Sequence, residues 1–399
     1  MQNHGSGAGP LHGVRVLDLS RALSGPYTAR IFADLGADVV KVEPPDGDEA
    51  RLVAPHHDRD MSALITFANV GKRGLCLDLR QPGAADVVLD LAAAAHVLVE
   101  NFRPGVMDRL GLGWDLLHAR NPRLVQLSVN GFGSEGEAAT RRAYAPVVHG
   151  ETGVVESQAA SAGTDIAPFR EHWGDTVASL HGAVGALAAL RTAERTGRGE
   201  RVEVAMFDAL LSTCSEALNL LLPEPDDRWV NPILDAGPNG RIATTGAVQH
   251  VWASVARTFP EIEDPAPAGE SREVRARARF AALERWAADQ PSTDALLARL
   301  DEAGIGAGPV LPMAEVLRGA LARERELLVE VDDRRGGTRP VVRPPARFSD
   351  SRNEVAGPAP RLGEHGREVL SEWLGYEPSR IGALESGGIL LSPEGAEGS

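Results

Sequence analysis

The stretch VRVLDLSRALSGPYTARIFADLGADVVKVEPP, residues 14–45, decides the fold class of this chain. Residues 14–19 and 37–42 are short apolar runs of the kind that form buried strands, and residues 27–35 between them have a helical pattern. A glycine ends this helix, and two consecutive prolines stop the second strand. The stretch therefore predicts two parallel strands that are joined by a helix.

The same alternation continues after this first unit. Strands are expected at residues 74–79, 97–100 and 124–129, with helices at residues 84–95 and 116–119. A chain that alternates strands and helices in this way builds a parallel sheet covered by helices. Ligands of such sheets bind beyond the carboxyl ends of the strands. Three loops follow strands and are expected to converge on one crevice: residues 20–26, 101–105 and 130–136.

The chain has 399 residues, which is long enough for two domains. We predict an α/β fold with a large Rossmann-like parallel-sheet domain and a smaller α+β domain. The large domain is expected to span residues 10–222 and to be completed by a return segment at residues 313–384. A connector rich in proline, aspartate and asparagine and the small domain occupy residues 223–312. The small and polar residues of 1–9 and 385–399 predict flexible tails.

The composition is that of a soluble globular protein, with 43% hydrophobic and 24% charged residues. The net charge of −15 argues against nucleic acid and membranes as partners, because anionic surfaces would be repelled. Of the 41 basic residues only Lys41 and Lys72 are lysines. Cys76 and Cys214 form neither a disulfide framework nor a metal-binding spacing, and the histidine-rich residues 56–60 lack a fixed ligand spacing. We therefore expect a cytoplasmic protein without a bound metal.

The position of Asp175 points to chemistry. This residue lies between a polar turn, residues 171–174, and a helical pattern of apolar residues over 177–190. The pattern predicts a buried helix with Asp175 in its first turn, where the partial positive charge of the helix N-terminus favours the ionised carboxylate. A bare carboxylate can attack a thioester. Aspartate is also among the best helix-capping residues, so a purely structural role stays open.

Ordered blocks over nearly the whole chain resemble the class III CoA-transferases, the family that includes formyl-CoA transferase, carnitine CoA-transferase and the α-methylacyl-CoA racemases. The central block comprises Gly174, Asp175 and the segment RTGRGERVEV at residues 195–204. The other blocks lie at residues 11–26, 35–43, 69–78, 99–105, 131–133 and 362–370. Because these blocks follow the family's order, together they are more specific than any single motif.

The resemblance implies an enzyme that transfers CoA from an acyl-CoA thioester to a small carboxylic acid. Asp175 would be the nucleophile, forming first an aspartyl anhydride and then an aspartyl-CoA thioester. CoA is then a substrate, and no permanently bound cofactor is expected. The resemblance also implies an interlocked homodimer, in which two chains pass through each other. It places the CoA-binding site at Ser24, Lys72, Arg73, Asn101, Phe102, Arg103, Arg109, Arg142 and Tyr144.

Two alternatives to transfer stay open. In the racemase branch, the positions of Tyr144 and Ala145 read His-Asp, and that histidine is one of two bases that deprotonate the α-carbon. This chain lacks the histidine, and we interpret the nearby His149 as a structural residue, so transfer is favoured over 2-methylacyl-CoA racemisation or epimerisation. The small domain is short and lacks the family's glycine-rich flap. A CoA-binding accessory protein with little catalytic activity is therefore the other alternative.

Overall fold

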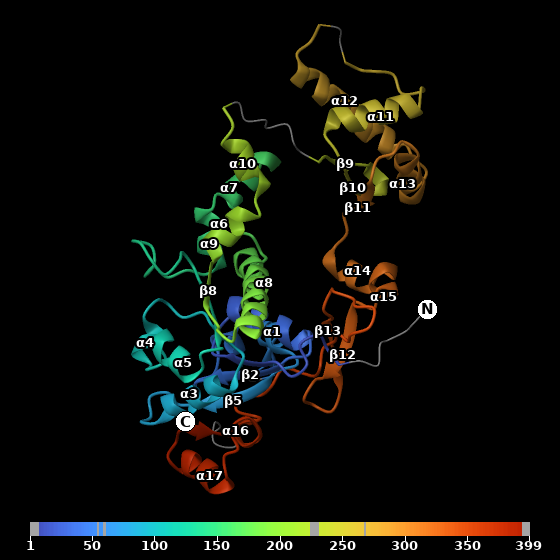
Figure 1. Cartoon of the computed structure of the whole chain (residues 1–399). Helices are drawn as coiled ribbons and strands as arrows, with labels where there is room; N and C mark the ends of the chain where they lie inside the picture. The colour runs from blue at the N-terminus through green and yellow to red at the C-terminus, as the bar shows by residue number, and fades with distance from the viewer. Residues whose placement is uncertain (1–7, 54–55, 59–60, 224–230, 267–268, 393–399) are drawn as a thin grey trace. The chain divides into compact units, whose positions relative to one another are not determined.

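The computed structural model describes residues 8–53, 56–58, 61–223, 231–266 and 269–392 (Figure 1). The chain divides into two compact units. The first unit contains the residues up to Cys214 and those from Arg325 onward, and the second unit is Ser215–Glu324. The predicted small domain, residues 223–312, lies within the second unit.

Among the described residues, a seven-stranded sheet forms the centre of the first unit. Its strand order is β14-β5-β2-β1-β6-β7-β8, and all neighbouring strands are parallel except β14 and β5. All residues of β6 and β7 are buried, as expected for a sheet with helices on both faces. The strands are β1 (Arg15–Asp18), β2 (Asp38–Glu43), β5 (Arg73–Leu77), β6 (Val97–Glu100), β7 (Val125–Asn130), β8 (Arg201–Ala205) and β14 (Leu390–Leu391).

Two hydrophobic cores lie on opposite faces of this sheet. Leu17 and Leu98 belong to one core, and Val16 and Val97 belong to the other, because successive side chains of a strand alternate between faces. A mostly parallel sheet with a hydrophobic core on each face confirms the predicted α/β fold class. The first core is covered by α3 (Ala84–Ala94), α5 (Trp114–Arg120) and α16 (Gly366–Leu374). The second is covered by α1 (Ser24–Asp34), α8 (Trp173–Thr196) and α9 (Met206–Ser212).

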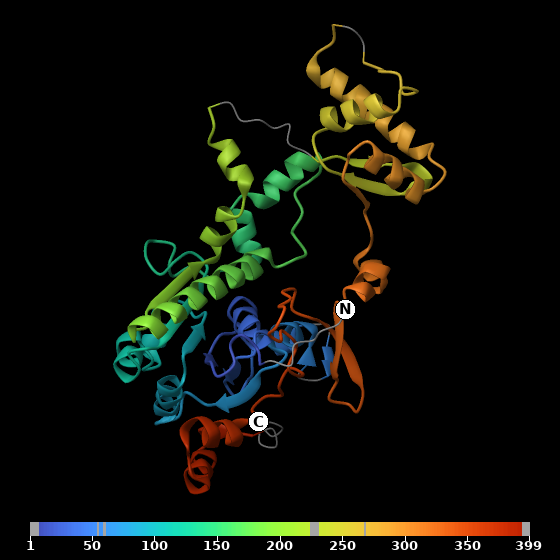
Figure 2. The same cartoon turned by 45° about the vertical axis from the view of Figure 1, so that its right-hand side comes forward.

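The remaining elements of the first unit connect or extend these layers. An antiparallel hairpin is formed by β12 (Leu328–Asp332) and β13 (Thr338–Val342). Figures 1 and 2 show the C-terminal helices α16 and α17, in red, beside the sheet. The other elements are η1 (Glu49–Leu52), β3 (His56–Asp58), β4 (Met61–Ser62), α2 (Ala63–Asn69), α4 (Val106–Arg109), α6 (Ala145–Glu151), α7 (Val154–Ala162) and α17 (Pro378–Ser386).

The second unit has its own core, in which Trp252 and Trp286 are nearly buried. Its antiparallel sheet has the order β11-β10-β9. The sequence patterns of residues 248–259, 274–290 and 293–303 predict three helices, and the structure confirms them to within two residues. Its elements are α10 (Ser215–Leu220), β9 (Ile233–Asp235), η2 (Gly237–Asn239), β10 (Arg241–Thr244), α11 (Val248–Thr258), α12 (Arg272–Ala288), α13 (Thr293–Glu302), β11 (Ala307–Pro309), α14 (Met313–Arg318) and α15 (Ala320–Glu324).

The helix that carries Asp175 buries a different face from the one that its sequence pattern predicted. Its larger apolar residues Leu180 and Val184 are 53% and 67% exposed. Small residues face the sheet instead, and a Cβ on Gly182 would lie only 3.1 Å from a methyl group of Leu127. Small side chains let the helix approach the sheet closely. The predicted helix is therefore confirmed; within its apolar pattern Leu190 is buried, whereas Leu180 and Val184 are exposed.

Two predicted boundaries also need correction. The tail predicted from residue 385 is partly ordered, because α17 ends at Ser386 and β14 pairs with β5, with Leu390 opposite Leu77. The apolar pattern of residues 207–222 predicts a single helix, but the chain forms α9 and α10 with a break at Cys214. Residues 1–7 and 393–399, which make up most of the predicted tails, lie outside the described residues.

The chain reverses its direction of travel across the sheet at β1, which pairs with β2 on one side and β6 on the other. The loops after β1 and β6 therefore leave the same edge of the sheet, where ligands of such folds bind. The backbone N–H of Arg21 donates to Asn101 Oδ1 at 2.8 Å, and Asn101 Nδ2 donates to the Arg21 carbonyl at 2.7 Å. The predicted convergence of loops 20–26 and 101–105 is confirmed.

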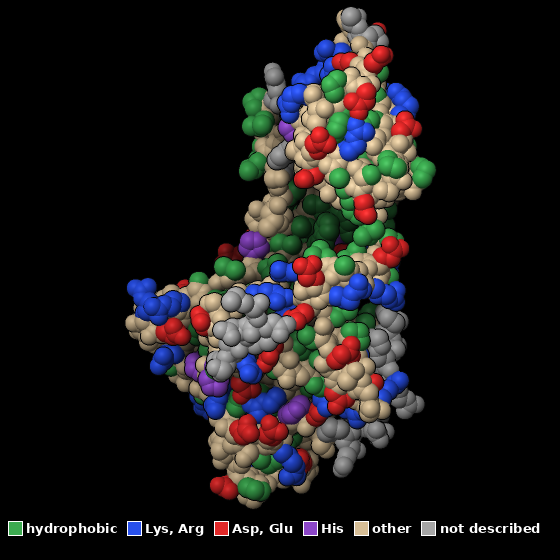
Figure 3. Space-filling view, turned by 90° about the vertical axis from the view of Figure 1, so that its right-hand side faces the viewer, with side chains coloured by type: hydrophobic (Ala, Val, Ile, Leu, Met, Phe, Trp, Pro, Cys, Tyr) green, Lys and Arg blue, Asp and Glu red, His purple; other side chains and the backbone are tan. Residues whose placement is uncertain are grey.

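No helix among the described residues combines the length and the apolar character needed to cross a bilayer. On the face shown in Figure 3, basic and acidic side chains are interspersed. The described residues of that face therefore do not form the continuous basic surface that phosphate backbones favour.

Candidate active site

Asp175 is held between the starts of three helices. It lies in the first turn of α8 and is only 7% exposed. Two donors close to its carboxylate lower its pKa: the hydroxyl of Ser24, the first residue of α1, and the backbone N–H of Ala145, the first residue of α6. Helix N-termini carry partial positive charge. The fold therefore supplies this carboxylate with donors from segments far apart in the sequence.

Burial raises the pKa of Asp175 to about 6, because a desolvated carboxylate is disfavoured. The charge of His172 and the hydrogen bonds from Ser24 and Ala145 act in the opposite direction and keep the pKa from rising further. The sequence predicted only the stabilising effect of the helix N-terminus, and desolvation outweighs it. A carboxyl group with this pKa is still mostly ionised at pH 7. It is also more basic than an exposed aspartate, which favours nucleophilic attack.

The loop after β1 has a conformation that its neighbours impose. Ala22 has a φ of +60°, in the left-handed region that non-glycine residues rarely adopt. Gly25 is required for space, because a Cβ there would lie 2.2 Å from the Cβ of Ser20. The carbonyl oxygen of Ser24 accepts a hydrogen bond from Ser179 Oγ of α8 at 2.6 Å. These contacts fix the hydroxyl of Ser24 beside Asp175.

The environment of His149 supports a structural role for this side chain. Its Nε2 accepts a hydrogen bond of 2.9 Å from the backbone N–H of Gly174, so it takes up a free donor at the start of α8. Burial lowers the pKa of His149, which favours the neutral ring that this hydrogen bond requires. Tyr144 is 55% exposed and donates to Glu49 Oε1 at 2.9 Å. Neither side chain is placed as a free base for racemisation.

The residues predicted to bind CoA fall into two groups. Ser24, Asn101 and Phe102 lie at the crevice, and Asn101 Nδ2 donates to Ser24 Oγ at 3.2 Å. Three exposed arginines continue this group along the loops after β6 and before α6, and none has an ion pair with a described residue: Arg103, Arg109 and Arg142.

Lys72 and Arg73 form the second group, and both have their charges engaged within the fold. The Lys72 ammonium is fully buried and donates to Asp18 Oδ2, Pro26 O and Asn69 Oδ1 at 2.7–2.8 Å. Arg73 lies at the start of β5, at the opposite edge of the sheet, and pairs with Asp38 at 2.6 Å. We therefore correct the prediction that these two side chains contact CoA.

The sequence did not single out a cavity at the carboxyl ends of β1, β2, β5 and β6. It measures 270 Å³, and its walls are mostly apolar, including Leu19, Val42, Leu77 and Phe102. Arg21, Pro44 and Arg80 also line it. Within the described chain, the buried Nε of Arg21 has no hydrogen-bond partner. Arg21, Pro44 and Arg80 could have been found from the sequence, because each of them follows a predicted strand.

A nearly buried carboxylate and an apolar cavity therefore share one edge of a parallel sheet, an arrangement suited to acyl chemistry on a ligand with a planar ring. The profile of CoA-transferase family III matches residues 11–366, and the chain belongs to this family. The chain is 32% identical to the formyl-CoA:oxalate CoA-transferase of Streptomyces avermitilis, over 95% of this chain and 99% of that protein. It is therefore a family III CoA-transferase.

Other relatives agree with this assignment. The chain is 29% identical to the succinyl-CoA–L-malate CoA-transferase beta subunit of Chloroflexus aurantiacus, over 94% of this chain and 97% of that protein. Its fold is similar to the crystal structure of an aspartate-to-alanine mutant of Rv3272 from Mycobacterium tuberculosis, with a TM-score of 0.78, 29% identity, and 91% of this chain and 99% of that chain covered. A CAIB/BAIF family protein from Brucella suis has a TM-score of 0.76 at 28% identity, over 92% of this chain and all of that chain.

Proposed function

We propose that this enzyme transfers CoA from an acyl-CoA thioester to a small carboxylic acid through covalent intermediates on Asp175. One observation carries the proposal: a nearly buried carboxylate lies at the crevice of the sheet, where the hydroxyl of Ser24 and the backbone N–H of Ala145 lower its pKa. Buried carboxyl groups with a raised pKa are typical of reactive sites. A simple helix cap needs neither the burial nor the convergence of three helix starts.

The chemistry requires two exchanges at the same carboxylate. Asp175 attacks the carbonyl carbon of the donor, the C–S bond breaks, and a mixed anhydride and the CoA thiolate result. The thiolate attacks the aspartyl carbonyl carbon, which releases the donor acid as its carboxylate and leaves an aspartyl-CoA thioester. The carboxylate of the acceptor acid then attacks this thioester to form a second anhydride and thiolate. Attack of the thiolate on the acceptor carbonyl gives the new acyl-CoA and restores Asp175.

The burial of Asp175 suits this sequence in two ways. A mixed anhydride hydrolyses if water reaches it, and the site leaves only 7% of the residue exposed. Each attack on the aspartyl carbonyl also places negative charge on its oxygen. The backbone N–H of Ala145, which lowers the pKa of this carboxylate, is placed to stabilise the oxyanion.

We propose that the 270 Å³ cavity takes the adenine end of CoA. Its apolar walls include Phe102, which offers a face for a planar ring. The phosphates require cationic donors close to the cavity and to the crevice. Arg21 and Arg80 line the cavity, and Arg103, Arg109 and Arg142 complete the set proposed for phosphate binding.

We also propose that the enzyme works as an interlocked homodimer in the cytoplasm. The exposed apolar residues Leu180 and Val184 of α8 form a stripe that a second chain would cover. Leu218 and the leucines that follow it, which are 55–80% exposed, add further apolar surface. Both cysteines are free thiols, as expected in a reducing compartment.

The test is intact-protein mass spectrometry after mixing the enzyme with acyl-CoA donors, followed by hydroxylamine. The acids named for the relatives define the first panel: formyl-CoA and succinyl-CoA as donors, with oxalate and malate as acceptors. We expect a hydroxylamine-sensitive CoA adduct in the wild type and none in Asp175→Asn. CoA binding without any adduct would favour the accessory-protein alternative, and loss of label from the α-carbon would favour racemisation.

A further inference from the structure

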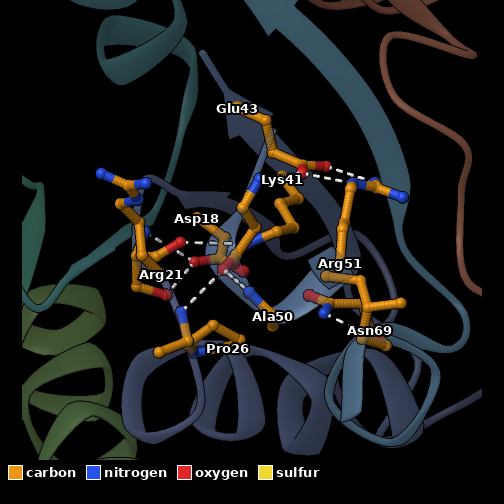
Figure 4. Close-up of polar contacts among 12 residues, drawn as sticks. Asp18, Arg21, Pro26, Lys41, Glu43, Ala50, Arg51 and Asn69 are labelled. Carbon is orange, nitrogen blue, oxygen red and sulfur yellow. Dashed lines mark hydrogen bonds and ion pairs between the residues drawn. The ribbon is translucent and has the colours of Figure 1, made fainter. Parts of the chain in front are cut away.

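The only two lysines of the chain meet in one buried cluster. Lys41 of β2 pairs with Asp48 at 2.8 Å, and Lys72 pairs with Asp18 of β1 at 2.7 Å (Figure 4). All four side chains are 0% exposed. Every other basic residue is arginine. An ammonium group is compact and has three donors that rotate freely, whereas guanidinium is a larger planar fork. We call Asp18, Lys41, Asp48 and Lys72 the buried charge cluster.

The cluster is hard to explain by stability alone. Taking two ion pairs out of water costs desolvation free energy, and the attraction within each pair barely offsets this cost. Buried ion pairs therefore contribute little to the stability of the fold. Their best-supported use is to fix one conformation among several. Burial lowers the pKa of Lys72 to about 8, while Asp18 and Asp48 act to keep it charged. The question is therefore which part of the structure these charges hold in place.

The contacts of the cluster lead to one loop, residues 20–26. Lys41 Nζ donates to the carbonyl oxygen of Ser20 at 2.9 Å, and Asp18 accepts hydrogen bonds from the N–H and the hydroxyl of Ser20. Asp48 Oδ1 accepts the N–H of Ala22 at 2.9 Å. Farther along, Lys72 Nζ donates to the carbonyl oxygen of Pro26 at 2.8 Å. Figure 4 shows the side chain of Arg21 pointing away from these buried charges.

These contacts hold a conformation that the loop would otherwise avoid. A left-handed φ at a non-glycine residue is costly and persists only where several contacts impose it. Ala22, with its φ of +60°, lies between the contacts at Ser20 and Pro26. The N–H of Ala22 itself donates to Asp48 Oδ1. Ser24 follows two residues later in the same loop. Its hydroxyl lies close enough to the carboxylate of Asp175 to lower the pKa of that group.

We propose that Asp18, Lys41, Asp48 and Lys72 are positioning residues, which fix loop 20–26 so that Ser24 meets the reacting carboxylate of Asp175. The proposal rests on the role of Asp175 proposed above. The cluster itself touches neither this carboxylate nor the apolar walls of the cavity. It acts through the backbone of the loop, and in this way it sets the reactivity of Asp175.

The variant Asp48→Asn tests this idea. The asparagine keeps a carbonyl oxygen for the N–H groups of Ala22 and Ala50, but it removes the negative charge beside Lys41. We expect adduct formation at pH 7 to slow about tenfold. The acid limb of its pH profile should move to higher pH, because Ser24 no longer lowers the pKa of Asp175.

Restoring the loop provides the second arm of the test. Glycine adopts a positive φ without the penalty that alanine has. Adding Ala22→Gly to Asp48→Asn should therefore recover part of the lost rate and return the acid limb toward its original position. His172 and Tyr144 also interact electrostatically with Asp175. Neither residue is altered in these variants, so any change in the pH profile comes from the loop.

The matched control is Asp34→Asn. Asp34 is also a nearly buried aspartate of the same unit, it pairs with Arg30 at 3.3 Å, and it feels the charge of Lys72. It makes no hydrogen bond to the described atoms of loop 20–26. We expect its adduct rate and pH profile to match the wild type, which separates loss of a buried charge elsewhere in the unit from loss of a charge in the cluster that holds the loop.

The outcomes distinguish this inference from the proposed function. Absence of an adduct in the wild type would contradict the role of Asp175 itself. An adduct in the wild type, together with a folded Asp48→Asn protein of unchanged rate and pH profile, would show that the cluster does not position the loop. Should Asp48→Asn fail to fold, Asp48→Ser, which also removes the charge and keeps only a shorter acceptor, is measured in the same way. Unchanged behaviour of that variant would overturn the inference equally.

Discussion

Replacing Ser24 with alanine isolates the hydrogen bond that tunes the candidate nucleophile. Ser24 is buried, and its hydroxyl lowers the pKa of the Asp175 carboxylate, which is about 6. A hydrogen bond to a charged group contributes about 1.5–3 kcal/mol, and one pKa unit corresponds to about 1.4 kcal/mol. Loss of the hydroxyl should therefore raise the pKa of Asp175 by roughly one to two units. The reacting carboxylate would then titrate at a pH of about 7 to 8.

The rate of adduct formation reports this shift. At pH 7 the ionised fraction of Asp175 falls from about nine tenths in the wild type to between about one half and one tenth in Ser24→Ala. Rapid-quench mass spectrometry between pH 5.5 and 9 should show a displaced acid limb and converging rates at high pH. Ser62→Ala is the control, because this buried serine caps α2 and does not contact Asp175. An acid limb in Ser24→Ala that coincides with the wild type would refute the reasoning.

Three further predictions concern stability and assembly. Burial raises the pKa of Asp175 to about 6, so the buried charge costs stability above pH 6, and this cost disappears as the pH falls toward the ordinary pKa. The free energy of unfolding of Asp175→Asn, measured with urea, should therefore exceed that of the wild type by about 1–3 kcal/mol at pH 8 and equal it at pH 4. Equal free energies of unfolding at pH 8 would contradict this prediction. His149→Phe leaves the N–H of Gly174 without an acceptor and should lose about 1–3 kcal/mol, whereas His149→Gln should lose less. Leu180→Glu places a charge in the apolar stripe and should give monomers in light scattering; an unchanged mass would argue against an interface there.

The sequence determined the fold class because the signals for it are local. Apolar runs bounded by glycine and proline marked the strands, and helical spacing marked the crossovers, so the parallel sheet followed. Loops 20–26 and 101–105 could be placed at one edge because they follow strands. Asp175 could be placed at the start of a helix, since the change from a polar turn to an apolar pattern is visible in the sequence.

Charge partners could not be predicted in the same way. The sequence shows that Lys72 is basic, but Asp18, which takes up its charge, lies 54 positions away. Arg73 follows directly and lies at the opposite edge of the sheet, because it starts a strand whose end faces the crevice. A basic residue in a matching block therefore predicts a ligand contact only after its partners within the fold are known.

The sequence by itself determined the order of strands and helices and the first turn that carries Asp175, because backbone periodicity and capping are properties of neighbouring residues. Only the tertiary structure decided which face of α8 is buried, that β14 completes the sheet, and that Ser24 and Ala145 donate to Asp175. These features depend on contacts between segments far apart in the chain. The raised pKa of Asp175 is likewise a property of burial, which exists only once those segments have packed together.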